Sequence, residues 1–328
     1  MNGKRILALL AAIMLVCGVS AAGAEALKQS EIGFYLDTVI TLTAYTEDVQ
    51  PLKDALEECG RYEKLLSRTM EGSDVWKINH AGGESVQVSD DTAAILRCAQ
   101  EISRLSGGAF DVTIAPASML WDFTSGAAVL PDAEALSRAA ALVDWTKISL
   151  DGNQVTLPEG MMIDLGGIAK GYIADRIKAY LADRGIEHAI LSFGGNIVAI
   201  GTKPDGSDWK VGIQDIDEPT GNYMLVARNK GGSTVTSGIY ERGFELDGIR
   251  YHHLLSPKTG WPAQNELASV TIFSESSMEG DALATAAFVL GTEEGLKLIE
   301  SLEGIEAVFI ARNREATYSS GAKDYMID

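Results

Sequence analysis

Cysteine and histidine are scarce in this chain of 328 residues, which has three cysteines and four histidines. Cys59 and Cys98 are the two cysteines beyond the N-terminal region, and each lies in a helical pattern. Their separation excludes a zinc ribbon and a redox C-x-x-C motif. A disulfide between them requires Cα atoms that lie close together, which the sequence does not reveal, so the disulfide stays open at this stage.

Positive charge is also scarce, because 27 Lys and Arg stand against 46 Asp and Glu and give a formal net charge of -19. An acidic chain repels the phosphate backbone, which argues against nucleic acid as a partner. Long apolar runs are missing beyond the N-terminal region, where no segment reaches the roughly 20 residues that a membrane-spanning helix needs. We also find no internal repeat and no low-complexity tract.

Residues 1–24 have the features of a secretory signal peptide: two basic residues, an apolar run over residues 6–19, and an A-x-A cleavage motif. The alternative is an uncleaved membrane anchor, for which the run is short. Cys17 raises a third possibility, lipid attachment, although Val16 before it fits such a site poorly. We therefore expect an exported protein whose residues 25–328 form one large domain or two interlocked subdomains with a substantial core.

Periodicity predicts strands and helices that intermingle without a regular βαβ rhythm, which is typical of the α+β class. The predicted helices cover residues 51–67, 91–105, 132–142, 277–290 and 293–302, and a strand, glycine turn and helix cover residues 161–184. The predicted strands cover residues 32–45, 189–192, 197–201, 209–214, 223–227, 233–237, 269–273 and 307–311, with a short hairpin at Asp151-Gly152. Residues 108–126 are expected to form a structured loop that presents aromatic side chains.

The sequence DLGGIAKG, residues 164–171, places Asp164 and a glycine pair at the predicted start of a helix. Exposed backbone amides at such a position bind anions, and Lys170 in the first helical turn can reach a bound phosphate. The sequence matches neither G-x-x-x-x-G-K-[ST] nor G-x-G-x-x-G. The alternative is a glycine pair that only caps and packs the helix. SFGGN, residues 192–196, holds a second glycine pair, where backbone can approach a planar ligand or form a β-bulge.

Asp281 and Thr285 lie one helical turn apart, so that their oxygens share one helix face. A carboxylate and a hydroxyl suit a hard cation such as Mg²⁺, which also keeps water or substrate phosphates in its shell. The alternative is an aspartate that caps the helix and a threonine that bonds back to the preceding turn.

Two of the four histidines, His252 and His253, precede a Pro-x-Thr-Gly turn in the segment YHHLLSPKTG. Histidine can transfer protons near neutral pH, and in a strand only one of two neighbours faces a given site. The pair lacks the spacing of a helical zinc site. We prefer His253 as the catalytic residue because it lies one step closer to the turn. An anion site, a cation site and a proton acceptor together suggest phosphate chemistry.

Seven segments together resemble the ApbE family of FAD:protein FMN transferases: FYLDTVITLTAY, SGGAFDVTIAP, MIDLGGIAKGYIAD, SFGGNIVAIG, TSGIYERGF, YHHLLSPKTG and GDALATAAFVLG. The resemblance implies an α+β, T-fold-related architecture of mixed and largely antiparallel sheets with packed helices. It also implies a magnesium-dependent enzyme that cleaves FAD, attaches FMN to a threonine or serine hydroxyl of an acceptor protein, and releases AMP.

By resemblance, His253 is the catalytic base, and the metal ligands are Asp281, Thr285 and the main-chain carbonyl of Gly167. The FAD contacts implied in the same way are Leu36, Ala109, Phe110, Asp111, Asp164, Lys170 and Leu255. Four residues depart from the usual family pattern: Leu36, Thr69, Ser256 and Ala284. The expected acceptor is a redox protein of the cell envelope, and the expected location is the periplasm or the outer face of the membrane, with a lipid anchor as an option.

Two other functions compete with protein flavinylation. One is an FAD pyrophosphatase that gives FMN and AMP because water replaces the protein hydroxyl. The other is a flavin-binding lipoprotein without turnover, against which the presence of Asp281, Thr285 and His253 argues.

Overall fold

The structure is a computed structural model, and it describes residues 27–125, 127–218 and 221–327. The predicted signal peptide and the candidate lipid site at Cys17 lie outside the described residues. Among the described residues, no helix combines the length and the apolar character needed to cross a membrane.

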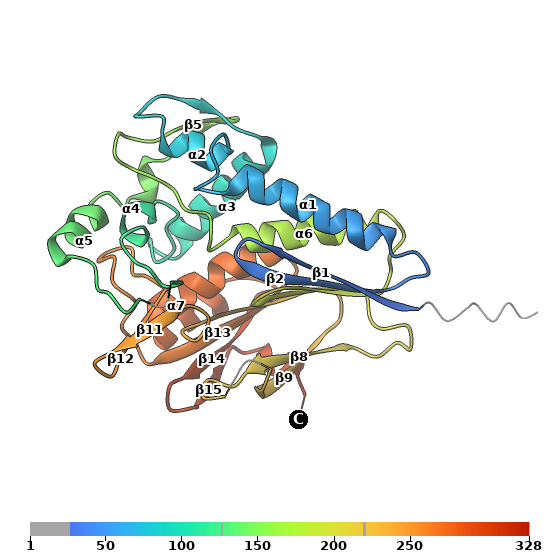
Figure 1. Ribbon diagram of the computed structural model, residues 1–328. Helices are drawn as coiled ribbons and strands as arrows, with labels where there is room; N and C mark the ends of the chain where they lie inside the picture. Colours follow the sequence, from blue (N-terminus) through green and yellow to red (C-terminus); the bar gives the residue numbers. More distant parts are fainter. Residues whose placement is uncertain (1–26, 126, 219–220, 328) are drawn as a thin grey trace, which may run out of the picture.

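An eight-stranded sheet in which all neighbouring strands are antiparallel organises the fold (Figure 1). Its strands in spatial order are β1 (Lys28–Tyr35), β2 (Thr38–Tyr45), β6 (Ala189–Phe193), β7 (Asn196–Ile200), β10 (Ser233–Gly238), β13 (Leu267–Ser274), β14 (Glu306–Ala311) and β15 (Ala316–Tyr318). Hairpins join β1 to β2, β6 to β7 and β14 to β15, whereas helices are inserted between β2 and β6 and between β13 and β14. The α+β class with antiparallel sheets is therefore confirmed.

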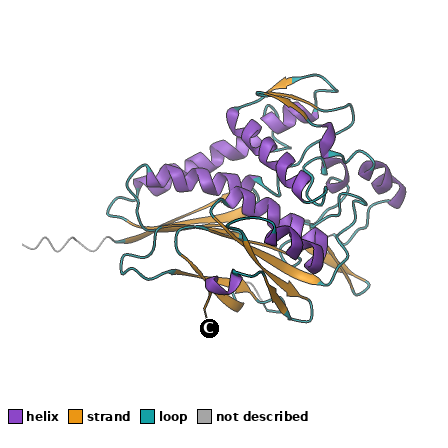
Figure 2. Cartoon of the chain, turned by 180° about the vertical axis from the view of Figure 1, so that it is seen from behind, coloured by secondary structure: helices purple, strands orange, loops and turns teal. Residues whose placement is uncertain are grey.

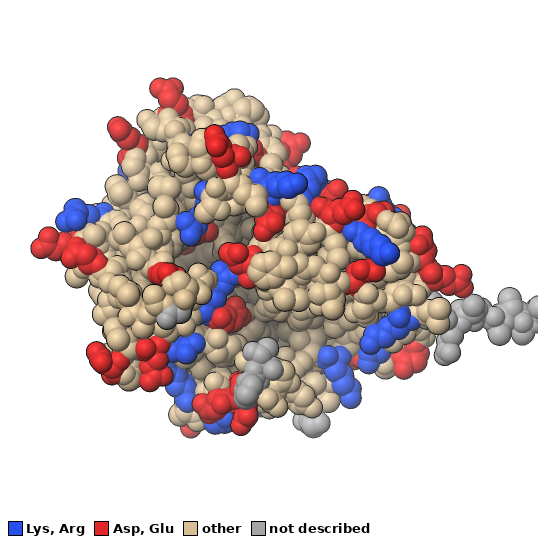
Figure 3. Space-filling model, in the orientation of Figure 1, with Lys and Arg blue, Asp and Glu red and all other residues tan. Residues whose placement is uncertain are grey.

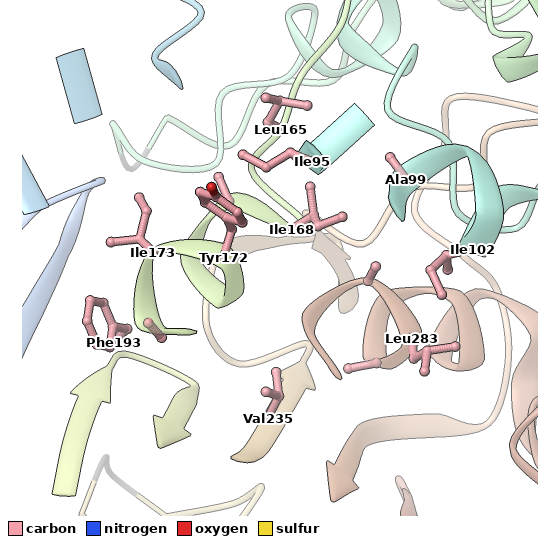
Figure 4. Close-up of a cluster of buried hydrophobic side chains, with 14 of the residues drawn as sticks. Ile95, Ala99, Ile102, Leu165, Ile168, Tyr172, Ile173, Phe193, Val235 and Leu283 are labelled. Carbon is pink, nitrogen blue, oxygen red and sulfur yellow. The ribbon is translucent and has the colours of Figure 1, made fainter. Parts of the chain in front are cut away.

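Helices cover one face of this sheet and bury its apolar side, as the views from both sides show (Figures 1 and 2). They are α1 (Gln50–Leu66), α3 (Asp90–Leu105), α6 (Ala169–Ala182) and α7 (Ser277–Glu300). Ile173 of α6, Phe193 of β6 and Val235 of β10 are fully buried between these layers (Figure 4). The packing holds the starts of α6 and α7 against the sheet.

A small sheet, β16 (Met326–Ile327), β9 (Tyr223–Asn229) and β8 (Trp209–Gln214), lies on the opposite face. Its side chains Ile213 and Ala227 form a second core with Phe273 of β13 and with Val308 and Ile310 of β14. The small sheet therefore covers the β13–β14 side of the large sheet.

The remaining elements surround these layers. They are α2 (Asp74–Asn79), α4 (Ala115–Ser118), α5 (Ala133–Ala140), η1 (Trp145–Lys147), η2 (Ala322–Tyr325), β3 (Val86–Gln87), β4 (Ser149–Asp151), β5 (Gln154–Thr156), β11 (Gly243–Leu246) and β12 (Ile249–His252). The hairpin predicted at Asp151-Gly152 is confirmed by the pairing of β4 with β5.

Several predicted elements differ in the structure. The single strand predicted over residues 32–45 is the β1–β2 hairpin, because Leu36 and Asp37 both take positive φ (56° and 54°) and form a two-residue turn. No strand precedes the glycine turn at residue 164; Met162 forms only an isolated bridge with Ile114. The break predicted between the two C-terminal helices is confirmed: α7 carries one label, but its backbone is non-helical at Gly291 (φ 79°), which separates two helices. The β1–β2 turn is a bend that apolar periodicity alone does not predict.

Both described cysteines are free. Cys59 is buried and Cys98 is partly buried, and burial raises the pKa of each thiol to about 12. The disulfide that the sequence left open is therefore not formed, and neither thiol is poised as a nucleophile.

Candidate functional site

One cleft of about 1040 Å³ collects all the predicted site residues, and the space-filling view shows the hollow with acidic and basic side chains around it (Figure 3). These residues are Leu36, Ala109, Phe110, Asp111, Asp164, Gly167, Lys170, His253, Leu255, Asp281 and Thr285. They come from five separate stretches of the chain, so tertiary packing rather than local sequence assembles the site.

The close crossing of α6 and α7 forms the base of the cleft. A Cβ on Gly171 would lie 2.1 Å from the carbonyl oxygen of Ser277, so only glycine permits this approach. The crossing brings the Gly171 amide within 3.0 Å of Asp281 Oδ2, and the amide donates a hydrogen bond to this carboxylate. The start of α6 thus binds a carboxylate of its own chain.

Asp281 is only 3% exposed, and Lys170 balances its charge. Lys170 Nζ lies 3.2 Å and 3.3 Å from the two carboxylate oxygens and donates to the Gly166 carbonyl at 3.1 Å. A buried carboxylate needs such a cation, because desolvation strongly disfavours an isolated charge. The position beside the Asp281 carboxylate therefore favours a positive charge.

Thr285 and Gly167 complete an oxygen-rich corner of the cleft. Thr285 Oγ1 lies 3.6 Å from the position that a Cβ on Gly167 would occupy, so the hydroxyl faces the glycine turn directly. A carboxylate, a hydroxyl and the main-chain oxygens of the turn are hard donors that fit Mg²⁺. No group of three or more His, Cys, Asp or Glu in the described residues could hold a metal, so a cation here depends on this mixed set.

His253 lies in the cleft with one ring nitrogen already engaged. Its backbone N–H and its Nδ1 lie 3.2 Å and 3.3 Å from the carbonyl oxygen of Arg242. Because a carbonyl only accepts, Nδ1 carries the proton and Nε2 keeps a free lone pair. Burial lowers the pKa of His253 to about 3, opposed by the Arg242 hydrogen bond and reinforced by the charge of Lys170. His253 is therefore neutral at pH 7 and able to accept a proton.

His252 has the opposite environment. Its side chain is fully buried, with its ring 5.5 Å from that of Phe288, and neither ring nitrogen has a hydrogen-bond partner among the described residues. Burial lowers the pKa of His252 to about 4. His253 lines the cleft and His252 does not, and the preference for His253 as the catalytic residue stays a prediction.

Two predicted FAD contacts, Asp111 and Asp164, have structural partners of their own. Both oxygens of Asp111 accept hydrogen bonds, one from the amide and hydroxyl of Thr113 (2.8 and 2.6 Å) and the other from the Trp145 amide (2.9 Å). Burial raises the Asp111 pKa. Asp164 pairs with Arg68 at 3.1 Å. Asp111 therefore holds its loop, and its contact with a ligand stays a prediction.

Leu36 occupies the strained turn between β1 and β2. Left-handed backbone costs a non-glycine residue roughly 1–2 kcal/mol, so its neighbours have to hold it. The Leu36 amide donates to Glu63 Oε1 at 2.7 Å, and Arg242 donates to the Asp37 carbonyl at 3.1 Å. These bonds fix the turn at the edge of the cleft.

Aromatic side chains form a wall beside the cleft, as expected for residues 108–126. Trp121 and Phe123 line the cleft with ring centroids 5.2 Å apart, and Trp121 Nε1 donates to the Gly260 carbonyl at 2.9 Å. Trp261 packs edge-on against Trp121. The contacts of Trp121 with Gly260 and Trp261 therefore join the aromatic loop to the turn that follows His253.

Sequence reasoning assigned no role to Glu241, which lines the cleft and whose backbone N–H donates to the Gly238 carbonyl, while its carboxylate has no hydrogen-bond partner among the described residues. Desolvation within the cleft raises the pKa of Glu241 to about 7; the charge of Lys170 opposes this shift and that of Asp281 reinforces it. Glu241 Oε1 lies 2.7 Å from the position of a Cβ on Gly195. The glycine pair at Gly194 and Gly195 is thus a hairpin turn that makes room for Glu241. The segment TSGIYERGF contained this residue but gave no physical indication of its role.

The antiparallel sheet with helices on one face and this polar cleft define an α+β protein with a nucleotide-sized site. The sequence model of the ApbE family matches residues 36–309, and the chain belongs to the ApbE family. It is 36% identical over 289 residues to an FAD:protein FMN transferase of Klebsiella pneumoniae (86% of this chain, 88% of that protein). It is 34% identical over 336 residues to one of Treponema pallidum (95% and 93%).

Solved structures show the same architecture. The crystal structure of the ApbE protein of Thermotoga maritima superimposes with a TM-score of 0.84 at 30% identity, covering 92% of this chain and 100% of that chain. The flavin transferase ApbE of Vibrio cholerae superimposes with a TM-score of 0.82 at 26% identity, covering 92% and 99%. The predicted ApbE-like fold is confirmed.

Proposed function

We propose that the chain is a magnesium-dependent FAD:protein FMN transferase, which moves FMN from FAD to a threonine or serine hydroxyl of an acceptor protein and releases AMP. The observation that carries the proposal is the meeting, in one cleft, of a neutral histidine with a free Nε2 and the oxygen donors of Asp281, Thr285 and the Gly167 turn. The names of the relatives support the same reaction.

His253 is the proton acceptor in the proposed reaction. Nε2 takes the proton of the acceptor hydroxyl, while the Arg242 carbonyl holds Nδ1–H and stabilises the charged ring that forms. The acceptor oxygen forms a bond to the phosphorus of the FMN half. The phosphoanhydride P–O bond to the other half breaks, and AMP leaves with the bond electrons.

The residues around Asp281 bind the diphosphate in this proposal. Lys170 would provide positive charge, and the Gly167 amide of the glycine turn would provide a hydrogen-bond donor, for phosphate oxygens. Bound Mg²⁺ would be held by Asp281, Thr285 and the Gly167 carbonyl, and it would neutralise diphosphate charge as the bond breaks. Leu36, Leu255 and the loop over residues 109–111 line the cleft around this centre and would contact the rest of FAD.

We also propose that the protein is exported and acts on a redox protein of the cell envelope. The support is the signal-like sequence of residues 1–24, with cleavage or lipid attachment at Cys17 as alternative outcomes. Residues 25–328 would then form the catalytic unit.

The test is intact-mass analysis of a candidate acceptor domain after incubation with the protein, FAD and Mg²⁺, beside a reaction without acceptor. A covalent FMN adduct on the acceptor, with AMP in equal amount, is the expected result. Free FMN and AMP with an unmodified acceptor would instead indicate an FAD pyrophosphatase. Unchanged FAD after long incubation would indicate a flavin-binding protein without turnover.

A further inference from the structure

The cleft extends beyond the predicted FAD contacts along the open face of the large sheet. Its floor there is a row of directly paired residues on successive strands: Thr41 of β2, Ser192 of β6, Ile197 of β7 and Thr234 of β10. None of these belongs to the predicted FAD or metal contacts. We call this extension, with the β8 residues that line it, the lateral groove.

An exposed apolar strip continues the floor to the edge of the sheet. Phe34 pairs with Val39, and Ile32 pairs with Thr41, so all four side chains lie on the groove face. Phe34 is 68% exposed, Ile32 67% and Val39 54%. Val39 also lines the cleft, so the strip and the cleft are continuous.

The free edge of a strand borders the groove. β8 is the last strand of the small sheet, paired only with β9 among the described residues, and its residues Val211, Gly212 and Gln214 line the cleft. An edge strand presents unpaired amides and carbonyls, and an extended polypeptide can bind such an edge through its main chain while its alternate side chains contact the floor.

We propose that the lateral groove binds an extended segment of the acceptor polypeptide and delivers its hydroxyl to His253. This proposal rests on the proposed function. The recessed floor of threonine, serine and isoleucine beside a strand edge favours a polypeptide over a lipid surface, because a planar bilayer can cover the exposed strip but cannot enter the groove. The continuity through Val39 provides the path from the strip to the catalytic base.

The experiment measures flavin transfer by the full chain with Ile32→Glu and Phe34→Glu, using the acceptor domain modified in the intact-mass assay. A carboxylate in an apolar contact should raise the KM for the acceptor about tenfold or more. FAD affinity and kcat at saturating acceptor should stay unchanged, since neither residue lines the FAD part of the cleft. Ile249→Glu, at a residue 51% exposed on β12, is the control that should leave the KM unchanged.

Photo-crosslinking gives a second readout that does not depend on turnover. A benzophenone side chain placed at position 34 should crosslink the purified acceptor domain, and the same group at position 249 should not.

If the Glu variants keep the parent's KM and crosslinking is equal at both positions, the proposal that the lateral groove binds the acceptor is wrong. The proposed transferase activity is not affected by that result. Loss of vesicle binding or of self-association in the Phe34 variant, with an unchanged KM, would assign the strip to a membrane or to a second copy. Absence of transfer by the parent protein to any acceptor would overturn the proposed function itself, and the groove assignment with it.

Discussion

Two adjacent histidines at the end of β12 have different environments. His253 faces the cleft and keeps a free nitrogen, whereas His252 is enclosed beside Phe288 with both nitrogens unpartnered. Buried polar atoms without partners are costly, so His252 weakens the fold at this point. Under the proposed function, substitutions at these two neighbouring positions should therefore affect stability and catalysis separately.

Replacing His253 by alanine should slow flavin transfer by a factor of about 10² to 10⁴, the usual contribution of a general base. FAD affinity should change little, because the phosphate and metal contacts remain. Initial rates from intact-mass analysis and FAD titration by flavin fluorescence measure the two effects. His80→Ala removes an exposed histidine that stacks on Trp76 and serves as the control. Full activity in His253→Ala would assign proton transfer to another group.

His252→Phe should make the free energy of unfolding less dependent on pH. Burial lowers the His252 pKa from 6.5 to about 4, so between these values the unfolded chain binds a proton that the folded chain refuses. The parent protein therefore loses stability as pH falls through this window, by about 3 kcal/mol at most from this residue. Urea unfolding at pH 7 and pH 4.5 measures the difference. Equal losses in the parent and the variant would show that His252 is protonated in the fold.

At the scale of elements, the contact between α6 and α7 determines the geometry of the site. Gly171 allows the two helices to touch, and the same contact joins the α6 amide to Asp281. Asp175 of α6 also accepts hydrogen bonds from the amides of Ser277 and Met278 at the start of α7. The helices are therefore fixed to one another by backbone contacts as well as by apolar packing.

Gly171→Ala should destabilise the fold by about 2 kcal/mol or more, because the added methyl overlaps a backbone carbonyl and the helices have to separate. It should also reduce FAD affinity, since the separation removes the amide from Asp281. Denaturant unfolding and FAD titration check the two effects. Ala179→Gly, at an exposed position of the same helix, should cost about 1 kcal/mol through helix propensity and leave FAD affinity unchanged. Equal effects of the two substitutions would contradict the crossing argument.

Helices were predictable from the sequence because apolar spacing and end signals agree: α1, α3, α5 and α6 lie within a few residues of their predicted bounds. Ser89 caps the start of α3, where its side chain accepts a hydrogen bond from the Thr92 amide. The β1–β2 hairpin was missed because Leu36 and Asp37 lack the glycine or asparagine that usually marks positive φ. The hairpin of β11 and β12 was missed because its strands have four residues each, too short to establish a period.

At the scale of the whole molecule, the cleft exists only where distant segments meet. Each motif located a chemical group, and the order of motifs indicated the family, so the predicted residues do converge. What the sequence could not provide was the set of partners across the cleft. The Lys170–Asp281 ion pair, the Arg242 carbonyl under His253 and the free carboxylate of Glu241 depend on contacts between residues far apart in the chain.

A site built from distant segments should stabilise the entire fold when it is filled. A ligand that binds only the native state at 100 times its Kd adds about 2.7 kcal/mol to the free energy of unfolding. We expect FAD with Mg²⁺ to raise the thermal midpoint of the parent protein, and chelation to remove most of this increase. Asp281→Asn should abolish the Mg²⁺-dependent part, because it removes the carboxylate of the donor set.

Glu279→Gln removes a charge from the exposed side of the same helix and should respond to FAD and Mg²⁺ as the parent does. Calorimetry of the three proteins with FAD alone, with FAD and Mg²⁺, and with FAD and chelator separates nucleotide binding from metal binding. If the increase in the thermal midpoint of the parent survives chelation, FAD binding does not depend on a metal at this site. An increase that survives in Asp281→Asn but vanishes with chelator would assign the metal to other ligands, and Glu241 would be the first carboxylate to examine, because it lines the cleft and Asp281 influences its pKa.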